Sequence, residues 1–119
     1  MHNKEKDIFC KIIAGDLPST VIAEGEDWIA IKDIHPQAPT HILIIPKDHI
    51  PGIGALSASQ GPMAGKLLVA VKEVAHALGL SADGYRVIIN HGEHGGQTVP
   101  HLHLHVLGGK PFGSKMIHE

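Results

Sequence analysis

The most informative six residues of the chain read His101-Leu102-His103-Leu104-His105-Val106. In a β-strand, alternate side chains point to opposite faces of the sheet, so the histidines would share one face and the aliphatic residues the other. On a helix the same side chains would scatter around the axis. The alternation therefore predicts a strand over 101–107, with its aliphatic residues in an apolar core and a row of imidazoles on the opposite face.

A row of three imidazoles admits three interpretations. As ordinary strand residues they would be crowded without benefit to the fold. As metal ligands they resemble His-x-His zinc sites, but no cysteine or carboxylate follows nearby, so a fourth ligand would have to come from elsewhere in the chain. As reacting groups, a neutral imidazole can attack phosphorus and a protonated neighbour can supply the proton that a leaving nitrogen needs. We favour the third interpretation, with a phosphoramidate as substrate and with no native metal and no cofactor.

The surroundings of the row suit a nucleotide. Gly95-Gly96-Gln97-Thr98 comes just before it, and glycines let backbone N–H groups approach an anion closely. Asn90 and Asp33 each follow a predicted strand, where an amide could contact phosphate and a carboxylate could hold sugar hydroxyls. These residues predict a phosphate-and-ribose site beside the histidines.

Composition narrows the class of protein. The chain has 119 residues, 43% hydrophobic and 18% charged, and a formal net charge of -2. These values indicate one globular domain. The slightly negative net charge argues against a basic surface that would bind nucleic acid. A single cysteine excludes an intrachain disulfide, and from the charged start and the short apolar runs we expect neither a signal peptide nor a membrane-spanning segment. We therefore expect a cytoplasmic protein with no nucleic-acid or membrane partner.

The periodicities predict an α+β domain over residues 1–119, with a disordered N-terminus at 1–6 and a tail at 110–119. We expect a short helix over residues 7–15, with Asp7 as its N-cap, and a long helix over residues 59–78, with an apolar stripe along one side. Strands are expected at 20–24, 28–32, 41–46, 85–90 and 101–107, in a five-stranded, mostly antiparallel sheet with 41–46 near its centre. The stripe of the long helix consists of Met63, Leu67, Ala70, Val74 and Ala77.

Six further histidines are expected at the surface, because they fall at termini, on a helix or in polar turns. They are His2, His49, His76, His91, His94 and His118.

Several separated motifs, taken together, resemble the histidine triad (HIT) family, and within it the Hint branch. They are the triad itself, the segment 33–41, the run 95–99, the start Phe9-Cys10-Lys11-Ile12-Ile13, Gly84-Tyr85-Arg86 and Leu107-Gly108-Gly109. The resemblance covers about residues 8–109, and the tail is more similar to bacterial members than to animal ones.

The resemblance implies the HIT fold, in a homodimer whose sheets join into one ten-stranded sheet. It implies hydrolysis of purine nucleoside 5′-phosphoramidates to the monophosphate and an amine. His103 would be the nucleophile, His105 would hydrogen-bond the phosphate or leaving group, and His101 and His41 would support the triad.

The nucleotide would be held by three groups of residues. Asp33 would bind the ribose hydroxyls, and Asn90, Gly96, Gln97 and Thr98 would surround the phosphate together with His103 and His105. The base would lie against an apolar wall of Ile8, Phe9, Ile12, Ile31, Ile34 and Leu43. Two alternatives stay open: another HIT-type nucleotide hydrolase or transferase, and a nucleotide-binding regulatory or scaffold protein.

Overall fold

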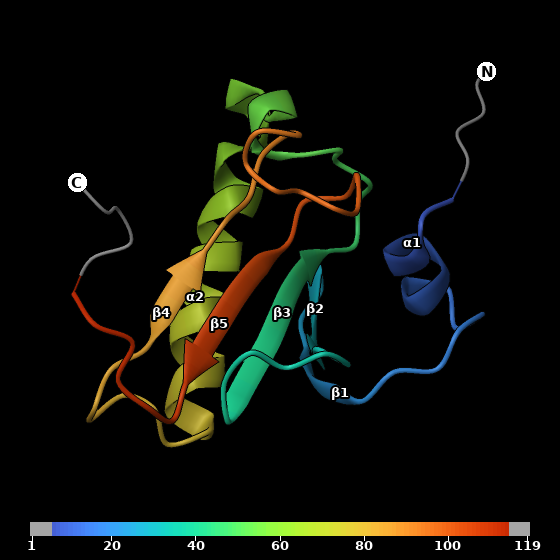
Figure 1. Ribbon diagram of the computed structural model, residues 1–119. Coiled ribbons are helices and arrows are strands. Elements are labelled where there is room, and N and C mark those ends of the chain that lie inside the picture. The colour runs from blue at the N-terminus through green and yellow to red at the C-terminus, as the bar shows by residue number, and fades with distance from the viewer. Residues whose placement is uncertain (1–5, 115–119) are drawn as a thin grey trace.

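The sheet runs in the order β1-β2-β3-β5-β4, and each neighbouring pair of strands is antiparallel. The structure is a computed structural model that describes residues 6–114 (Figure 1). The strands are β1 (Val21–Glu24), β2 (Trp28–Lys32), β3 (Thr40–Pro46), β4 (Arg86–Ile88) and β5 (Leu104–Gly108), and the helices are α1 (Ile8–Ile13) and α2 (Gly61–Ala77), with short 3-10 turns η1 (Ile53–Ala55) and η2 (Ala58–Gln60) before α2. The predicted α+β class and the central place of β3 are confirmed.

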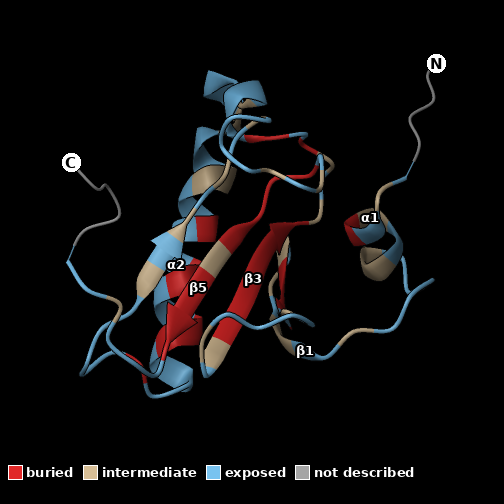
Figure 2. Cartoon of the chain, in the orientation of Figure 1, coloured by how far each residue is buried: buried red, intermediate tan, exposed pale blue. Residues whose placement is uncertain are grey.

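The two helices cover opposite faces of the sheet. On β3 and β5, Ile42, Ile44, Leu104 and Val106 pack with the buried side of α2. On the other face Phe9 of α1 packs with a second apolar cluster that contains Ile29, Ile31, Leu43 and Ile45. Figure 2 shows that burial is most continuous along β3 and β5, in the middle of the sheet. The strand alternation therefore decides which side chains face α2 and which face α1.

The alternation at the triad is as predicted, but the strand is shorter. Leu102 and Leu104 are each 2% exposed and Val106 is fully buried. The ladder between β3 and β5 stops where Ile44 pairs with Leu104, and the N–H of Leu102 donates instead to the carbonyl of Ile50 at 2.7 Å. His101 and His103 thus precede β5 on a segment outside the ladder between β3 and β5, which the sequence pattern does not reveal.

Helix α2 confirms most of its predicted stripe. Its buried residues are Leu67, Ala70, Val71, Val74 and Ala75. Ala77 is exposed, contrary to prediction, because Val74 and Ala75 form the buried side of the last turn. The N-cap of α1 is Asp7, as predicted, and its carboxylate accepts from the Cys10 N–H at 2.8 Å.

The ends of the chain are described only in part. The predictions for residues 1–5 and 115–119, including those for His2 and His118, lie outside the described residues. Residues 110–114 carry no helix or strand, and the Gly113 carbonyl accepts a hydrogen bond from the Arg86 guanidinium. Between residues 6 and 114, no helix is long and apolar enough to cross a membrane.

The packing on α2 predicts different costs for two matched substitutions. Val74 is 2% exposed and Val69 is 52% exposed on the same helix. Val74→Ala should lower the free energy of unfolding by about 2 kcal/mol, because it removes two buried methyl groups. Val69→Ala should change it by less than about 0.5 kcal/mol. Urea denaturation of both variants measures this, and equal losses would contradict the assignment of the buried stripe.

Candidate active site

The triad residues do not share one environment. His103 and His105 lie on the α1 face of the sheet with ring centroids 5.0 Å apart, and His41 on β3 lies beside His105, 5.2 Å between centroids. His101 turns away beneath α1 and is fully buried. The predicted set of four histidines is therefore brought together as a row of three rings with His101 behind it.

His103 is held in one tautomer by the backbone. Its Nδ1 lies 2.7 Å from the carbonyl oxygen of His101, and a carbonyl can only accept, so Nδ1 carries the hydrogen. The Nε2 atom of His103 then keeps its lone pair. Burial, the largest influence, lowers the pKa of His103, which favours the neutral ring. This is the state that a nucleophilic imidazole requires.

A second chain of hydrogen bonds orients His105. The backbone N–H of Gln37 donates to His41 Nδ1 at 3.0 Å, so the hydrogen of a neutral His41 ring is on Nε2. That atom lies 2.9 Å from His105 Nδ1 and 3.4 Å from a carboxylate oxygen of Asp33. His105 Nδ1 accepts, and its Nε2 therefore carries a hydrogen. His103 thus offers a lone pair where His105 offers a donor.

The electrostatics of His105 agree with this arrangement. Burial, together with the neighbouring His103 and His41 rings, lowers the pKa of His105 to about 4. The ring is therefore neutral at pH 7 in the free protein. An anion bound beside it would favour its protonated form.

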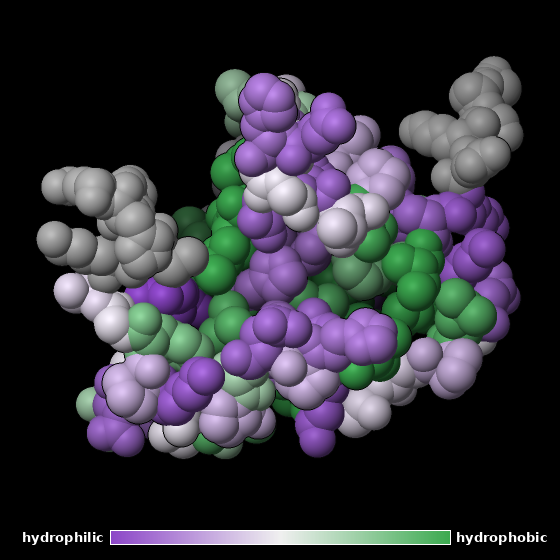
Figure 3. Space-filling model, in the orientation of Figure 1, coloured by the Kyte–Doolittle hydropathy of each residue, from purple (hydrophilic) through white to green (hydrophobic). Residues whose placement is uncertain are grey.

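Both rings line a cavity of about 330 Å³ between α1 and the sheet. Its size suits a small ligand. Of the predicted base wall it includes Ile8, Phe9, Ile12, Ile31, Ile34 and Leu43, and Asp33 and Thr98 also line it. Figure 3 shows that the surface between α1 and the sheet is largely apolar. The structure thus joins the apolar wall, the Asp33 carboxylate and the two histidines in one site.

Sequence analysis missed other residues that line this cavity. They are Leu17, Pro18, Ser19, Lys32, His35 and Val99. Leu17, Pro18 and Ser19 follow α1 in the chain, and only the fold shows that this segment borders the cavity.

Three of the residues predicted to contact phosphate, Asn90, Gly96 and Gln97, do not line the cavity. The Asn90 amide donates to the carbonyl of Gly95 at 2.7 Å. The Gln97 side chain pins its own loop, donating to the carbonyls of Pro51 and Val99 and accepting from the Gly92 N–H.

The backbone N–H groups of this loop are also engaged. Those of Gly95, Gly96 and Gln97 donate to carbonyls within residues 92–93. As the loop stands, these groups shape the segment that carries Thr98 rather than offering donors to an anion.

A second polar cluster lies behind the triad. It contains Asp7, Cys10, His49 and His101, whose potential ligand atoms all lie within 4.8 Å of one another. His49 is half-buried there, so the prediction of a surface position is wrong: α1 folds back over the turn that follows β3. A set of Asp33, His41 and His105 atoms within the active site meets the same distance limit.

The other predicted surface histidines are exposed, as expected: His76, His91 and His94. His91 nevertheless accepts a hydrogen bond from the Gly54 N–H at 3.3 Å.

Comparison with known proteins identifies the family. Residues 14–112 match the model of the HIT domain. The chain belongs to the HIT family. Over 115 residues it is 43% identical to the purine nucleoside phosphoramidase of Escherichia coli K12, with 97% of each chain covered.

Solved structures of HIT proteins share the fold. A HIT family hydrolase from Clostridium thermocellum is 47% identical, with a TM-score of 0.92 over 97% of this chain and 100% of the other. A histidine triad protein from Clostridium difficile is 36% identical, with a TM-score of 0.90 over 96% and 99% of the two chains. The resemblance to bacterial HIT proteins stated from the sequence is confirmed.

The lowered pKa of His105 predicts how stability depends on pH. Above pH 6.5 the ring is neutral in both the folded and the unfolded chain. Below that value the unfolded chain gains a proton that the folded chain refuses, so the free energy of unfolding falls as pH drops from 6.5 towards about 4. The loss from this ring should be at most about 3 kcal/mol.

His105→Gln keeps an acceptor for His41 but cannot titrate. It should reduce the difference in unfolding free energy between pH 7 and pH 4.5 by more than about 1 kcal/mol, measured by urea denaturation. The exposed His76→Gln serves as control and should retain the wild-type difference. An unchanged pH dependence in His105→Gln would show that its ring is not held neutral by burial.

Proposed function

We propose that this HIT protein hydrolyses the P–N bond of purine nucleoside 5′-phosphoramidates to give a nucleoside monophosphate and an amine. One observation carries the proposal: backbone and side-chain hydrogen bonds leave a lone pair on His103 Nε2 and a hydrogen on His105 Nε2, in the same cavity. A nucleophile beside a proton donor is what cleavage of a phosphoramidate requires.

In the first step His103 Nε2 attacks phosphorus and the bond from phosphorus to the amine nitrogen breaks. The anionic phosphoryl group favours uptake of a solvent proton by the His105 ring, and the Nε2 proton of the charged ring goes to the leaving nitrogen as the P–N bond breaks. The amine leaves neutral. The positive charge on the nucleotidyl-His103 ring is stabilised by the carbonyl of His101, which accepts its Nδ1 hydrogen at 2.7 Å.

In the second step water attacks phosphorus and His105 takes its proton. The bond from phosphorus to His103 Nε2 breaks, and the ring returns to its neutral state. His105 recovers the proton it gave in the first step, so the cycle is balanced. His41 orients His105 through the 2.9 Å contact, and the Gln37 N–H holds His41 in turn.

The remaining parts of the cavity suit a nucleoside. The Asp33 carboxylate, half-buried at its rim, would accept hydrogen bonds from the ribose hydroxyls, and the apolar wall would enclose a flat base. Thr98 lines the cavity and would contact the phosphate, while Asn90, Gly96 and Gln97 hold the loop that carries it. The purine preference also rests on the 43% identity to a protein named for that activity.

The homodimer is part of the proposal. β4 is an edge strand of the sheet. Exposed apolar side chains occur on or beside this strand and on α2, including Leu68 at 60% exposed and Val87 at 39%. A second copy pairing across this edge would continue the sheet and cover these residues. Analytical ultracentrifugation tests this directly.

Removing the nucleophile should separate catalysis from binding. His103→Ala should lower the turnover of a fluorogenic adenosine phosphoramidate by at least about 1,000-fold, because no other group offers a lone pair at that place. Affinity for the nucleoside monophosphate should change by less than about tenfold, since the wall and Asp33 remain.

Two comparisons accompany this assay. His76→Gln, on the exposed side of α2, should keep wild-type turnover. Faster turnover of diadenosine polyphosphate than of the phosphoramidate would favour the other HIT-type reactions. Nucleotide binding without turnover of either would favour a regulatory or scaffold protein, and wild-type turnover by His103→Ala would refute the nucleophile.

The role of Asp33 predicts a dependence on the sugar. Asp33→Asn should lower kcat/KM for the ribonucleoside substrate by about 10- to 100-fold, because charged hydrogen bonds to the hydroxyls become neutral ones. For a 2′,3′-dideoxy substrate the same variant should match the wild type within about threefold. Equal losses for both substrates would mean that Asp33 acts through His41 instead of through the ribose.

A further inference from the structure

The loop that leads to Thr98 is closed by its own residues. The Gly92 N–H donates to the side-chain oxygen of Gln97 at 2.9 Å, and the Gln97 N–H donates to the Gly92 carbonyl at 3.0 Å. His91 comes directly before this closing pair and Thr98 directly after it. A contact that holds His91 therefore also holds the segment that carries Thr98 at the nucleotide cavity.

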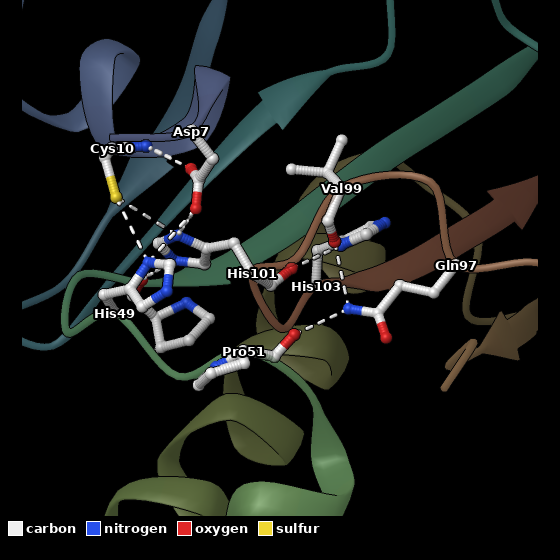
Figure 4. Close-up of polar contacts among 9 residues, drawn as sticks. Asp7, Cys10, His49, Pro51, Gln97, Val99, His101 and His103 are labelled. Carbon is white, nitrogen blue, oxygen red and sulfur yellow. Dashed lines mark hydrogen bonds and ion pairs between the residues drawn. The ribbon is translucent and has the colours of Figure 1, made fainter. Parts of the chain in front are cut away.

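Gln97 attaches the second half of this loop to residues 51–55, the segment that contains η1. Its side-chain N–H groups donate to the carbonyl of Pro51 at 2.7 Å and to the carbonyl of Val99 at 2.9 Å (Figure 4). The first half of the loop needs a contact of its own with the same segment.

The ring of His91 supplies that contact by lying against two glycines. The Gly54 N–H donates to His91 Nδ1 at 3.3 Å. A Cβ added to Gly54 would lie 2.6 Å from two atoms of the ring, and one added to Gly52 would lie 2.8 Å from Nδ1. Neither glycine has a positive φ, so the backbone does not require glycine at either position. The absent side chains instead make room for the ring.

The opposite side of the His91 ring is open. The ring is exposed and borders a cavity of about 530 Å³, which Thr98 also lines. An exposed ring contributes little burial to the stability of the fold. Replacing His91 should therefore leave the sheet and its core intact and change only how the loop is held.

We propose that His91 is a positioning residue for the hydrolytic reaction. Seated on Gly52 and Gly54, it fixes the loop so that Thr98 stays beside the phosphoryl group that His103 attacks. This inference rests on the proposed function. His91 does not line the nucleotide cavity, so it acts through Thr98. A misplacement of about 1 Å at a reacting centre can cost roughly 100-fold in rate, so a weak anchor on this loop has a measurable effect.

Kinetics of His91 variants test the role. His91→Ala should lower kcat for a fluorogenic adenosine phosphoramidate by about tenfold, while the affinity for adenosine monophosphate stays within about threefold of wild type. His91→Asn should keep kcat within about threefold of wild type, because its side-chain oxygen can accept from the Gly54 N–H. His94→Ala, an exposed histidine of the same loop, is the matched control and should keep wild-type kcat.

A substitution on the glycine side tests the same contact. Gly54→Ala should displace the ring and lower kcat about as much as His91→Ala, because the added Cβ would lie 2.6 Å from ring atoms. The double variant should lose no more than either single variant, since both remove one contact. Gly65→Ala on α2, where an added Cβ meets nothing within 4 Å, controls for the glycine replacement itself.

Hydrogen exchange reads the loop without any reaction. In His91→Ala the backbone N–H groups of Gly92 and Gln97 should exchange at least about fivefold faster than in wild type, and in His91→Asn they should exchange at the wild-type rate. If the wild type hydrolyses no phosphoramidate, the proposed function fails while this difference in exchange remains.

Three results would overturn the inference in a protein that hydrolyses the phosphoramidate. The first is wild-type kcat in His91→Ala, whatever the exchange rate. The second is a His91→Asn variant as slow as His91→Ala, which would mean that the hydrogen bond from Gly54 is irrelevant. The third is a double variant whose loss is the product of the two single losses, which would mean that the glycine and the ring act separately.

Discussion

The arrangement of the molecule depends on the burial of Leu102, Leu104 and Val106 against α2. Because strand side chains alternate, this burial directs the intervening histidines to the opposite face of the sheet. β3 responds in the same way, with Ile42 and Ile44 towards α2 and His41 on the histidine side. A shift of one residue in the register between β3 and β5 would move the imidazoles into the apolar core and abolish the site. The hydrophobic effect that stabilises the sheet thus also places its polar groups.

Backbone groups then assign different chemistry to side chains of the same type. His103 donates to a carbonyl and keeps a lone pair on Nε2, whereas His105 accepts from His41 and keeps a hydrogen there. Both rings are neutral at pH 7 because burial lowers their pKa values. Two histidines two residues apart are therefore a nucleophile and a donor, and the difference arises from which atom of each ring meets the protein.

Helix α1 has three roles despite its six residues. Its apolar side forms a wall of the cavity, and Phe9 packs on the rings of His101 and His103. Asp7 caps its first turn and contacts His49 and His101 with the other carboxylate oxygen. A helix this short is not stable alone, so it depends on these contacts to stay on the sheet. The wall that would grip the base and the residue behind the nucleophile are consequently held by the same cluster.

Local patterns in the sequence were enough to predict the five strands, the two helices and the identity of the triad, because period-2 and period-3.6 burial are read from neighbouring residues. They also suggested Asp33 as a site residue, whereas the apolar wall was expected only from the resemblance to the HIT family. They failed for His49 and Cys10, whose partners are separated from them by 39 and 91 residues. Local patterns also did not predict which ring nitrogen of each histidine carries the hydrogen, or that the Gln97 side chain turns back on its own loop. These features follow from contacts between distant segments, and only the tertiary structure, by packing α1 and the loops onto one face of the sheet, could determine them.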